Sequence, residues 1–177
     1  IDEYHEMYQV RMPGEYRPAG RPLRKTPIYD QLDDRGAQWQ DVWGWERVKY
    51  FGEPEHYSWR RSNAFNHVAD EVTGVRERVG IADLTAFAKF EVTGSDAAKL
   101  LDRISANRLP TKDGGIRLCH LLTDLGGIEG EMTITRLSED RFYISLSDSD
   151  LFNWISAINH TMKFHAYVNE VEIFTLA

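Results

Sequence analysis

The chain is poor in cysteine, in long apolar runs and in positive charge, and each shortage excludes a class of protein. Cys119 is the single cysteine among 177 residues, so no disulfide can form within the chain and a reducing compartment is expected. No stretch approaches the ~20 apolar residues of a transmembrane helix, so we expect no membrane partner. Lysine and arginine number 21 against 28 aspartates and glutamates, and the resulting net charge of −7 argues against nucleic-acid binding.

The common motifs for cofactors and metals are also missing. The chain has no G-x-G-x-x-G dinucleotide fingerprint, no P-loop and no H-E-x-x-H pattern. Its six histidines show neither helical spacing nor a ligand-like cluster, so we expect no metal site. Cys119 and His120 are neighbours on a predicted strand, where adjacent side chains point to opposite faces, which argues against a catalytic dyad. We expect Cys119 to be a small core residue.

Proline and tryptophan are concentrated in residues 1–61, which hold five of the six prolines and four of the five tryptophans. Proline fixes φ and lacks a backbone donor, so closely spaced prolines favour an extended path. We interpret 1–61 as an arm. Within it, residues 10–27 follow an extended path and residues 28–35 form a short helix. The tryptophans within 39–45 are interpreted as a packing anchor that docks the arm, and ligand stacking is the alternative.

Residues 62–177 show the periodicities of an α+β domain. Val68, Val72, Val75 and Val79 recur at helical spacing and predict an amphipathic helix. Three consecutive strands joined by short turns favour a mixed or antiparallel sheet over a doubly wound one. The predicted strands are 81–92, 116–122, 128–137, 141–146, 163–168 and 171–176, and the predicted helices after the valine helix are 96–105 and 149–159.

Both ends of the sequence indicate a piece of something larger. The last residues, 171–176, are apolar and rich in strand-forming residues, and such an open edge is an association hazard. We therefore expect the domain to continue beyond Ala177 or to be completed by a partner. The first residues have neither an initiator methionine nor the pattern of a signal peptide, and we expect others to precede Ile1.

Glu131 is the acidic residue that the pattern singles out. It lies on the polar face of the predicted strand 128–137, just after a glycine-containing turn at 123–127. One interpretation is a solvated strand carboxylate. The other is a carboxylate in a cleft, where partial desolvation adjusts it for charge stabilisation or proton transfer. Glu129 lies on the same face and competes for the role.

In the segments 19–30, 44–47, 49–51, 77–90, 105–107 and 122–137, the sequence resembles the sarcosine and dimethylglycine dehydrogenase family. One group of segments resembles the junction where the flavin-binding part of these enzymes meets the folate-binding part, and it comprises residues 19–30, 44–47 and 49–51. A second group resembles the folate-binding part itself, which is similar to the T-protein of the glycine-cleavage system, and it comprises residues 77–90, 105–107 and 122–137. The resemblance implies that 1–61 is the junction from the flavin-oxidoreductase part. It implies that 62–177 is the N-terminal portion of a T-protein-like aminomethyltransferase domain.

The resemblance implies an enzyme of one-carbon metabolism. Its members oxidise an N-methyl amine with FAD to an iminium and pass the one-carbon unit to tetrahydrofolate, giving 5,10-methylenetetrahydrofolate. The flavin fingerprint would precede Ile1 and the glutamate that grips the pterin would follow Ala177, so this chain alone is expected to be inactive. The implied partners are the amine, a flavin-binding domain or subunit and the remainder of the folate domain. The expected location is the cytoplasm, or the mitochondrial matrix in a eukaryote.

The resemblance also implies site residues. Glu131 falls on the acidic position beside folate N10, where T-proteins usually carry aspartate. A carboxylate there stabilises the iminium charge and can accept the amine proton. Phe87, Leu118 and Thr135 fall on positions that line the folate cleft, with Leu118 in place of a common tyrosine. Asn107 matches a family asparagine, and its alternative role is a turn at a helix C-terminus.

Two other functions stay open at this point. One is a non-catalytic folate-binding or scaffold module with the T-protein fold, which solvent exposure of Glu131 would favour. The other is a flavin-independent, tetrahydrofolate-dependent demethylase that acts on an S- or O-methyl substrate. The proline-rich segment argues against the demethylase, because it resembles a flavin-linked junction.

Overall fold

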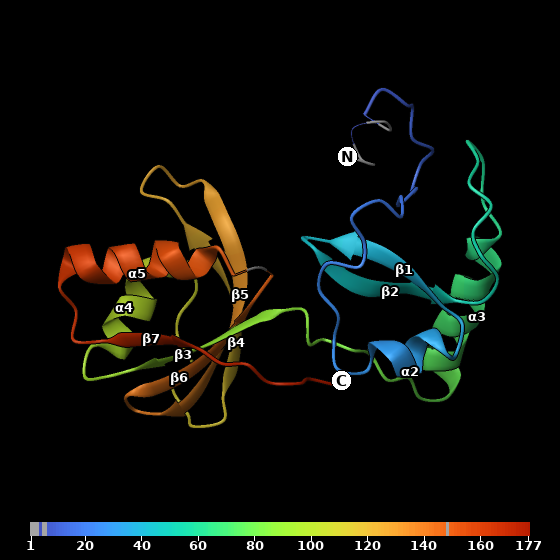
Figure 1. Ribbon diagram of the computed structural model, residues 1–177. Coiled ribbons are helices and arrows are strands. Elements are labelled where there is room, and N and C mark those ends of the chain that lie inside the picture. Colours follow the sequence, from blue (N-terminus) through green and yellow to red (C-terminus); the bar gives the residue numbers. More distant parts are fainter. Residues whose placement is uncertain (1–3, 5–6, 148) are drawn as a thin grey trace. The chain divides into compact units, whose positions relative to one another are not determined.

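The computed structural model describes residue 4 and residues 7–147 and 149–177, which form two compact units (Figure 1). Unit 1 consists of Ile1–Ala86 and Phe174–Ala177, and unit 2 is Phe87–Ile173. The first residues of the expected arm, 1–3 and 5–6, lie outside the described part of the chain. No helix in the described part is long and apolar enough to cross a membrane.

A two-stranded antiparallel sheet is the centre of unit 1. Strands β1 (Ala37–Val42) and β2 (Trp45–Phe51) pair along their length and are joined by the two residues Trp43 and Gly44. Both turn residues have positive φ, of 52° and 82°, which suits the right-handed twist of a tight hairpin. This hairpin is not predicted by the sequence pattern, in which the tryptophans around the turn indicate a packing cluster.

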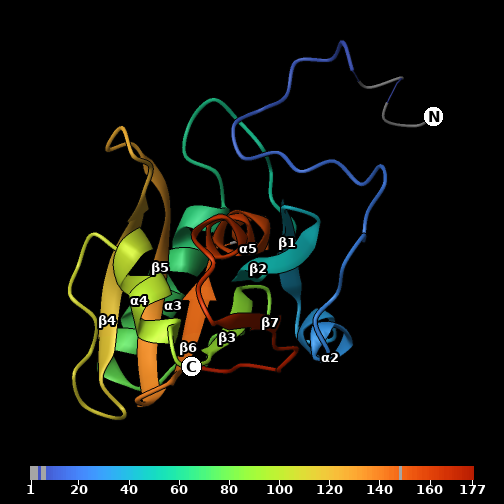
Figure 2. The same ribbon diagram turned by 90° about the vertical axis from the view of Figure 1, so that its left-hand side faces the viewer.

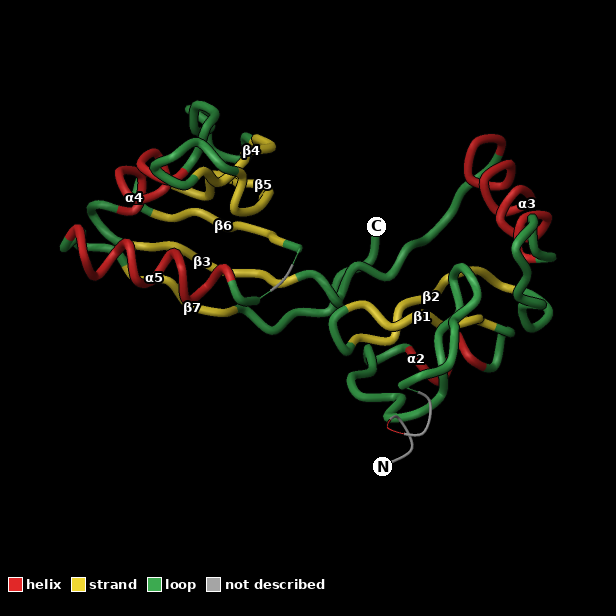
Figure 3. Tube along the Cα trace, turned by 90° about the horizontal axis from the view of Figure 1, so that it is seen from above, coloured by secondary structure: helices red, strands yellow, loops and turns green. Residues whose placement is uncertain are grey.

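Two helices flank this hairpin. Helix α2 (Tyr29–Asp33) contacts β1 and lies within the range expected for a short helix, while α3 (Ala64–Glu77) contacts β2 (Figure 3). The tryptophans of the hairpin differ in their surroundings. Trp39 stacks on Tyr29 with ring centroids 4.1 Å apart, and the Arg24 guanidinium lies 4.9 Å from the ring of Trp45. Trp43, at the turn, is 66% exposed.

The segment before α2 contacts the hairpin through backbone and side-chain bonds. Arg24 donates its backbone N–H to the carbonyl of Gly44 and accepts one from Glu46, each at 2.9 Å. The Glu46 carboxylate is buried, and Arg21 Nε donates to its Oε1 at 2.8 Å. A buried carboxylate is tolerated because it is paired with this guanidinium.

The expected apolar stripe is present on α3, but it is not buried. Val68, Val72 and Val75 are 38%, 49% and 61% exposed, and Val79 lies beyond the end of the helix. Ala64 is the buried residue of this helix. Helical periodicity therefore predicted the helix correctly, but it did not predict what packs against the stripe, because a stripe records only which side chains share a face.

Unit 2 contains a five-stranded sheet in the order β4-β5-β6-β3-β7, and every neighbouring pair is antiparallel. This confirms the α+β class and selects the antiparallel alternative for the described strands. The segment at 171–176, expected to be a strand, is not one of these strands and makes an isolated bridge at Leu176. The strands are β3 (Ala88–Thr93), β4 (Ile116–Leu122), β5 (Ile128–Ser138), β6 (Arg141–Leu146) and β7 (Tyr167–Glu170).

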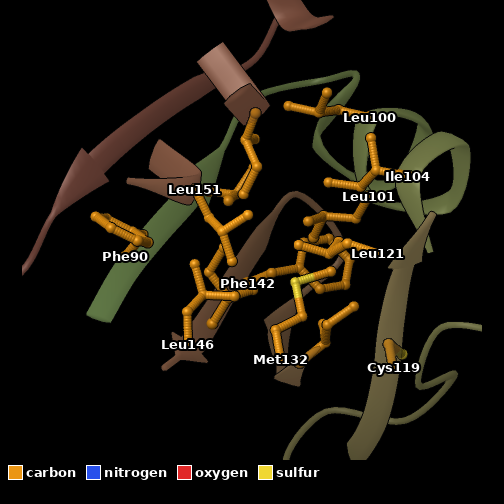
Figure 4. Close-up of a cluster of buried hydrophobic side chains, with 14 of the residues drawn as sticks. Phe90, Leu100, Leu101, Ile104, Cys119, Leu121, Met132, Phe142, Leu146 and Leu151 are labelled. Atoms are coloured by element: carbon orange, nitrogen blue, oxygen red, sulfur yellow. The ribbon is translucent and has the colours of Figure 1, made fainter. Parts of the chain in front are cut away.

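Helices α4 (Ala97–Ile104) and α5 (Leu151–Met162) cover one face of this sheet (Figure 2). The core lies between the helices and the sheet and combines inward-facing residues of every layer, as Figure 4 shows for Leu101, Met132 and Phe142. Cys119 is free and buried in this core, which confirms its expected role as a small core residue. Burial raises the pKa of its thiol, so the thiolate is disfavoured.

Candidate functional site

The opposite face of this sheet carries the sequence-predicted carboxylate. On β5, Met132 and Ile134 are buried in the core, so the alternating residues Glu131, Thr133 and Thr135 point to the other face. The same alternation holds on β4 and β6. We call this surface the open face, defined by Ile116, Leu118, His120, Glu131, Thr133, Thr135, Tyr143 and Ser145.

Glu131 contacts a histidine across the β4–β5 hairpin. His120 stands directly opposite it in the strand register, and the imidazole Nε2 lies 3.0 Å from the carboxylate Oε2. The two side chains are 49% and 55% exposed, respectively. The carboxylate is therefore half-exposed and contacts one partner. Its exposure is intermediate between the two interpretations that the sequence left open, a solvated strand carboxylate and a carboxylate in a cleft.

Two of the predicted folate-lining residues share this face with Glu131. Leu118 is opposite Thr133 and is 55% exposed, so its apolar side chain is available for contact. Thr135 is half-buried and lies opposite Ile116. It follows Thr133 by two residues on β5 and therefore shares its face. The open face thus combines a carboxylate, hydroxyl groups and exposed apolar carbon within two neighbouring strands.

Asn107 lies beside β4 in the loop that follows α4. Its Nδ2 donates to the backbone carbonyl of Leu118 at 3.1 Å, and its Oδ1 accepts the backbone N–H of Arg108 at 2.8 Å. These contacts hold the loop against the strand that carries Leu118. The structure therefore gives Asn107 a local bracing role, close to its alternative role in a turn after a helix.

Phe87 immediately precedes β3, at the same end of the sheet as Glu131. Leu146 on β6 pairs with Ala88 of β3 on one side and with Met132 of β5 on the other. Phe87 and Glu131, which immediately precede these two partners, therefore lie two strands apart at the same end of the sheet. Two strand spacings correspond to roughly 10 Å between backbones. Phe87 is half-buried, and its carbonyl accepts a hydrogen bond from Lys89 Nζ at 2.6 Å.

Two residues of the open face, His120 and Tyr143, were not among the predicted site residues. His120 was considered only as a partner for Cys119, although a hairpin closed by the turn at 123–127 brings it close to Glu131. Tyr143 is half-buried opposite Thr135, and its alternation with buried Phe142 would have placed it on this face. Burial raises the pKa of the Tyr143 phenol, which therefore stays protonated and able to donate at neutral pH.

A separate depression of about 430 Å³ lies on the helix-covered side of unit 2. It is lined by residues of α4, α5 and the turn after β4, and the Arg103–Asp124 ion pair, at 2.7 Å, forms part of its wall. None of the five sequence-predicted site residues lines it. Within the described part of the chain there is no group of three or more His, Cys, Asp or Glu side chains that could hold a metal ion.

Comparison with known proteins places these features in a family. Residues 28–177 match the GCVT N-terminal domain family. Sequence relatives include the mitochondrial pyruvate dehydrogenase phosphatase regulatory subunit of Mus musculus, 33% identical over 159 residues. They also include the 4-methylaminobutanoate oxidase (formaldehyde-forming) of Paenarthrobacter nicotinovorans and the mitochondrial dimethylglycine dehydrogenase of Homo sapiens, each 36% identical, over 143 and 155 residues.

These alignments cover most of this chain but little of the relatives. They include 84%, 78% and 82% of the chain and 18%, 17% and 18% of the respective relatives. The crystal structure of the glycine cleavage system aminomethyltransferase T from Bartonella henselae matches 87% of this chain and 40% of its own, with a TM-score of 0.69 and 21% identity. This likeness confirms the T-protein-like fold, and the relatives' names confirm the resemblance to dimethylglycine dehydrogenases.

Proposed function

The chain belongs to the GCVT N-terminal domain family, and from that premise we propose that it is the first part of the folate domain of an N-methyl amine dehydrogenase. The observation that carries the proposal is Glu131, a half-exposed carboxylate held on the open face beside Leu118 and Thr135. Two relatives support the substrate class, because dimethylglycine and 4-methylaminobutanoate, which their names contain, are both N-methylated amines.

The proposed reaction has two steps, oxidation of the amine and transfer of the one-carbon unit. In the first step the N-methyl group would lose a hydride and become an iminium cation, and FAD, held by parts of a longer protein, would supply the oxidising power by accepting that hydride. The iminium carbon is then bonded to N5 and N10 of tetrahydrofolate, which lose one hydrogen each. One of these hydrogens goes to the amine nitrogen as the carbon–nitrogen bond breaks, and the other leaves as a proton.

The residues of this chain would act in the second step. The Glu131 carboxylate would stabilise the positive charge beside it and accept the released proton. Leu118 would offer apolar surface to a planar ring, and the hydroxyl of Thr135 would orient a polar edge. This residue set fits one wall of a site for a pteridine-type carrier, with a carboxylate, a hydroxyl and exposed apolar carbon on adjacent strands.

The proposal assigns origins to the two regions of the chain. Residues 1–61 would be the junction from the flavin-binding part, and residues 62–177 the first portion of the folate domain. The partners would then be the flavin-binding part and the remainder of the folate domain. This agrees with the alignments, in which the chain spans less than a fifth of each of the three relatives. The location would be the mitochondrial matrix in a eukaryote or the cytoplasm in a bacterium, and the names of two relatives call those proteins mitochondrial.

Replacing Glu131 tests the proposal in the complete protein. Glu131→Gln keeps the size of the side chain but removes its charge, so the fraction of one-carbon units captured by tetrahydrofolate per amine oxidised should fall on the order of 100-fold. The released remainder would appear as free formaldehyde, and rapid-mixing measurement of flavin reduction gives the amine oxidised. Glu129→Gln, on the same strand, is the matched control and should stay within about twofold. Wild-type capture by Glu131→Gln would refute the proposal.

A second candidate is a non-catalytic module that binds folate or serves as a scaffold. Two observations favour it: one relative is named a regulatory subunit, and the Glu131 side chain is 55% exposed. The same measurements on the complete wild-type protein distinguish the two candidate functions. A non-catalytic module would give no amine-dependent flavin reduction and no methylenetetrahydrofolate, whether or not it bound tetrahydrofolate.

A further inference from the structure

We propose that His120 is the positioning residue of Glu131, holding one carboxylate oxygen so that the other faces the one-carbon carrier. This role rests on the proposed function, because it gives His120 a task only if Glu131 is the transferring carboxylate. It concerns a residue that the sequence pattern did not connect to the site. Three observations carry it: the register, the distance and the anchoring of His120.

The register makes the two side chains obligatory neighbours. His120 and Glu131 occupy facing positions of an antiparallel pair, where side-chain origins lie ~5 Å apart on the same face. The contact at 3.0 Å between Nε2 and Oε2 uses one of the two carboxylate oxygens. With the proton on Nε2, the imidazole donates to Oε2, and Oε1 keeps its lone pairs for another partner.

The backbone of His120 is anchored on both sides. It pairs with β5 through the hairpin register, and its carbonyl accepts the N–H of Ala106 at 2.9 Å. Asn107 adds a bond to the carbonyl of Leu118, two residues earlier on the same strand. A positioning group acts well only when its own backbone is fixed, and β4 provides this for His120.

The need for such a group follows from the length of glutamate. A half-exposed glutamate has three rotatable side-chain bonds and populates many rotamers, most of which point the carboxylate away from any one place. A bond from a fixed donor selects a few of these rotamers. An aspartate at the same position would have one rotatable bond fewer and would hold its carboxylate one methylene nearer its own backbone, away from the point that His120 Nε2 contacts in this structure.

The competing explanation is an ordinary cross-strand ion pair on a solvated surface. Half-exposed pairs of this kind stabilise a fold very little, so stability alone does not separate the two explanations. A positioning role instead predicts that removal of the imidazole lowers one-carbon transfer, and that it does so only while position 131 carries glutamate. The experiment therefore measures transfer in a double-mutant cycle.

The cycle uses His120→Leu and His120→Gln in the complete protein, each combined with Glu131 and with Glu131→Asp. With Glu131, His120→Leu should lower the captured fraction at saturating tetrahydrofolate on the order of fivefold, the upper range for a half-exposed pair. The tetrahydrofolate concentration for half-maximal capture should change less than about twofold, because the lost contact orients the carboxylate rather than binding the carrier. His120→Gln retains an N–H donor and should recover part of the loss. In the Glu131→Asp background, His120→Leu should have no effect.

The controls separate failure of this role from failure of the proposed function. His160→Leu, an exposed histidine on α5, should leave the captured fraction unchanged. Wild-type capture by both His120 variants, or an equal loss in the Glu131→Asp background, would overturn the positioning role alone. Wild-type capture by Glu131→Gln would overturn the proposed function and this role with it. His120→Gln keeps the test decisive if His120→Leu fails to fold.

Discussion

At the scale of single residues, Asp96 connects the start of α4 to the segment before β7. Its Oδ2 accepts the backbone N–H of His165 at 3.0 Å, and Lys99 Nζ donates to its Oδ1 at 2.6 Å. The hydrogen bond from Lys99, followed by that from His165, lowers the pKa of the Asp96 carboxyl. The folded protein therefore favours the ionised form, and Asp96, rather than Ser95 before it, occupies the N-cap position.

Replacement of Asp96 should destabilise the chain in a pH-dependent way. Because folding lowers its pKa, the ionised carboxyl contributes stability above the unfolded-state value of about 3.9, and that contribution disappears as the pH falls through the folded-state value. Asp96→Asn should therefore unfold at lower urea concentration than the wild type near pH 7, and the difference should be smaller at about pH 3, below the unfolded-state pKa.

The control for this experiment is on the same helix. Asp102 is exposed on α4, and Asp102→Asn should shift the free energy of unfolding by less than about 0.5 kcal/mol at either pH. A loss for Asp96→Asn that was equal at both pH values would mean that neutral contacts, and not the carboxylate charge, connect α4 to the segment before β7.

At the scale of elements, helices with similar sequence patterns acquire different packing. Helix α4 buries Leu100 and Leu101 completely against the sheet, whereas the valines of α3 are exposed. The difference lies in the surroundings. Helix α4 follows β3 directly and packs on the sheet that β3 helps to form, while α3 contacts the narrow two-stranded hairpin of unit 1.

Substitutions in the two environments should therefore have different costs in this chain. Val72→Ala removes exposed methyl groups and slightly raises helix propensity, so the free energy of unfolding should change by less than about 0.5 kcal/mol. Val92→Ala removes the same atoms from a fully buried site in β3 and should cost about 2 kcal/mol. Denaturant titration of both variants measures the contrast, and a cost at Val72 equal to that at Val92 would show that the α3 stripe is covered in solution.

At the scale of the whole molecule, the large hydrophobic cluster shown in Figure 4 lies within one unit. The buried cluster runs from Phe90 to Ala166, entirely within Phe87–Ile173. The last residues of the chain belong to unit 1, where Ala177 and Ala82 exchange two backbone hydrogen bonds at 2.7 and 3.0 Å. Unit 2 thus holds its own sheet and helices without needing the segment 174–177 for its core.

A fragment of residues 87–173 should consequently fold by itself. We expect a single cooperative transition in urea and well-dispersed amide signals in its NMR spectrum, because the fragment keeps all five strands and both covering helices. A matched fragment that ends at residue 164 lacks β7 and exposes the edge of β3, and it should be clearly less stable. An unfolded 87–173 fragment would show that unit 2 depends on unit 1.

Local sequence alone determined both helices of unit 2, its three consecutive strands β4, β5 and β6, and the face on which Glu131 lies. Alternation of polar and apolar residues is a property of a strand itself, so the strands near 116–122, 128–137 and 141–146 and the core position of Cys119 could be predicted. Family resemblance added the identity of the fold and the prediction of a role for Glu131, because ordered motifs carry information that periodicity does not.

The tertiary structure alone decided which residues face one another. A β-bulge between Leu121 and Leu122 shifts the register of the β4–β5 hairpin, and this register sets His120 opposite Glu131. Nothing local to either strand records that shift, since a register depends on the turn and on both strands together. The exposure of the valines on α3 was settled in the same way, because burial is a property of a pair of surfaces and a sequence pattern describes only one of them.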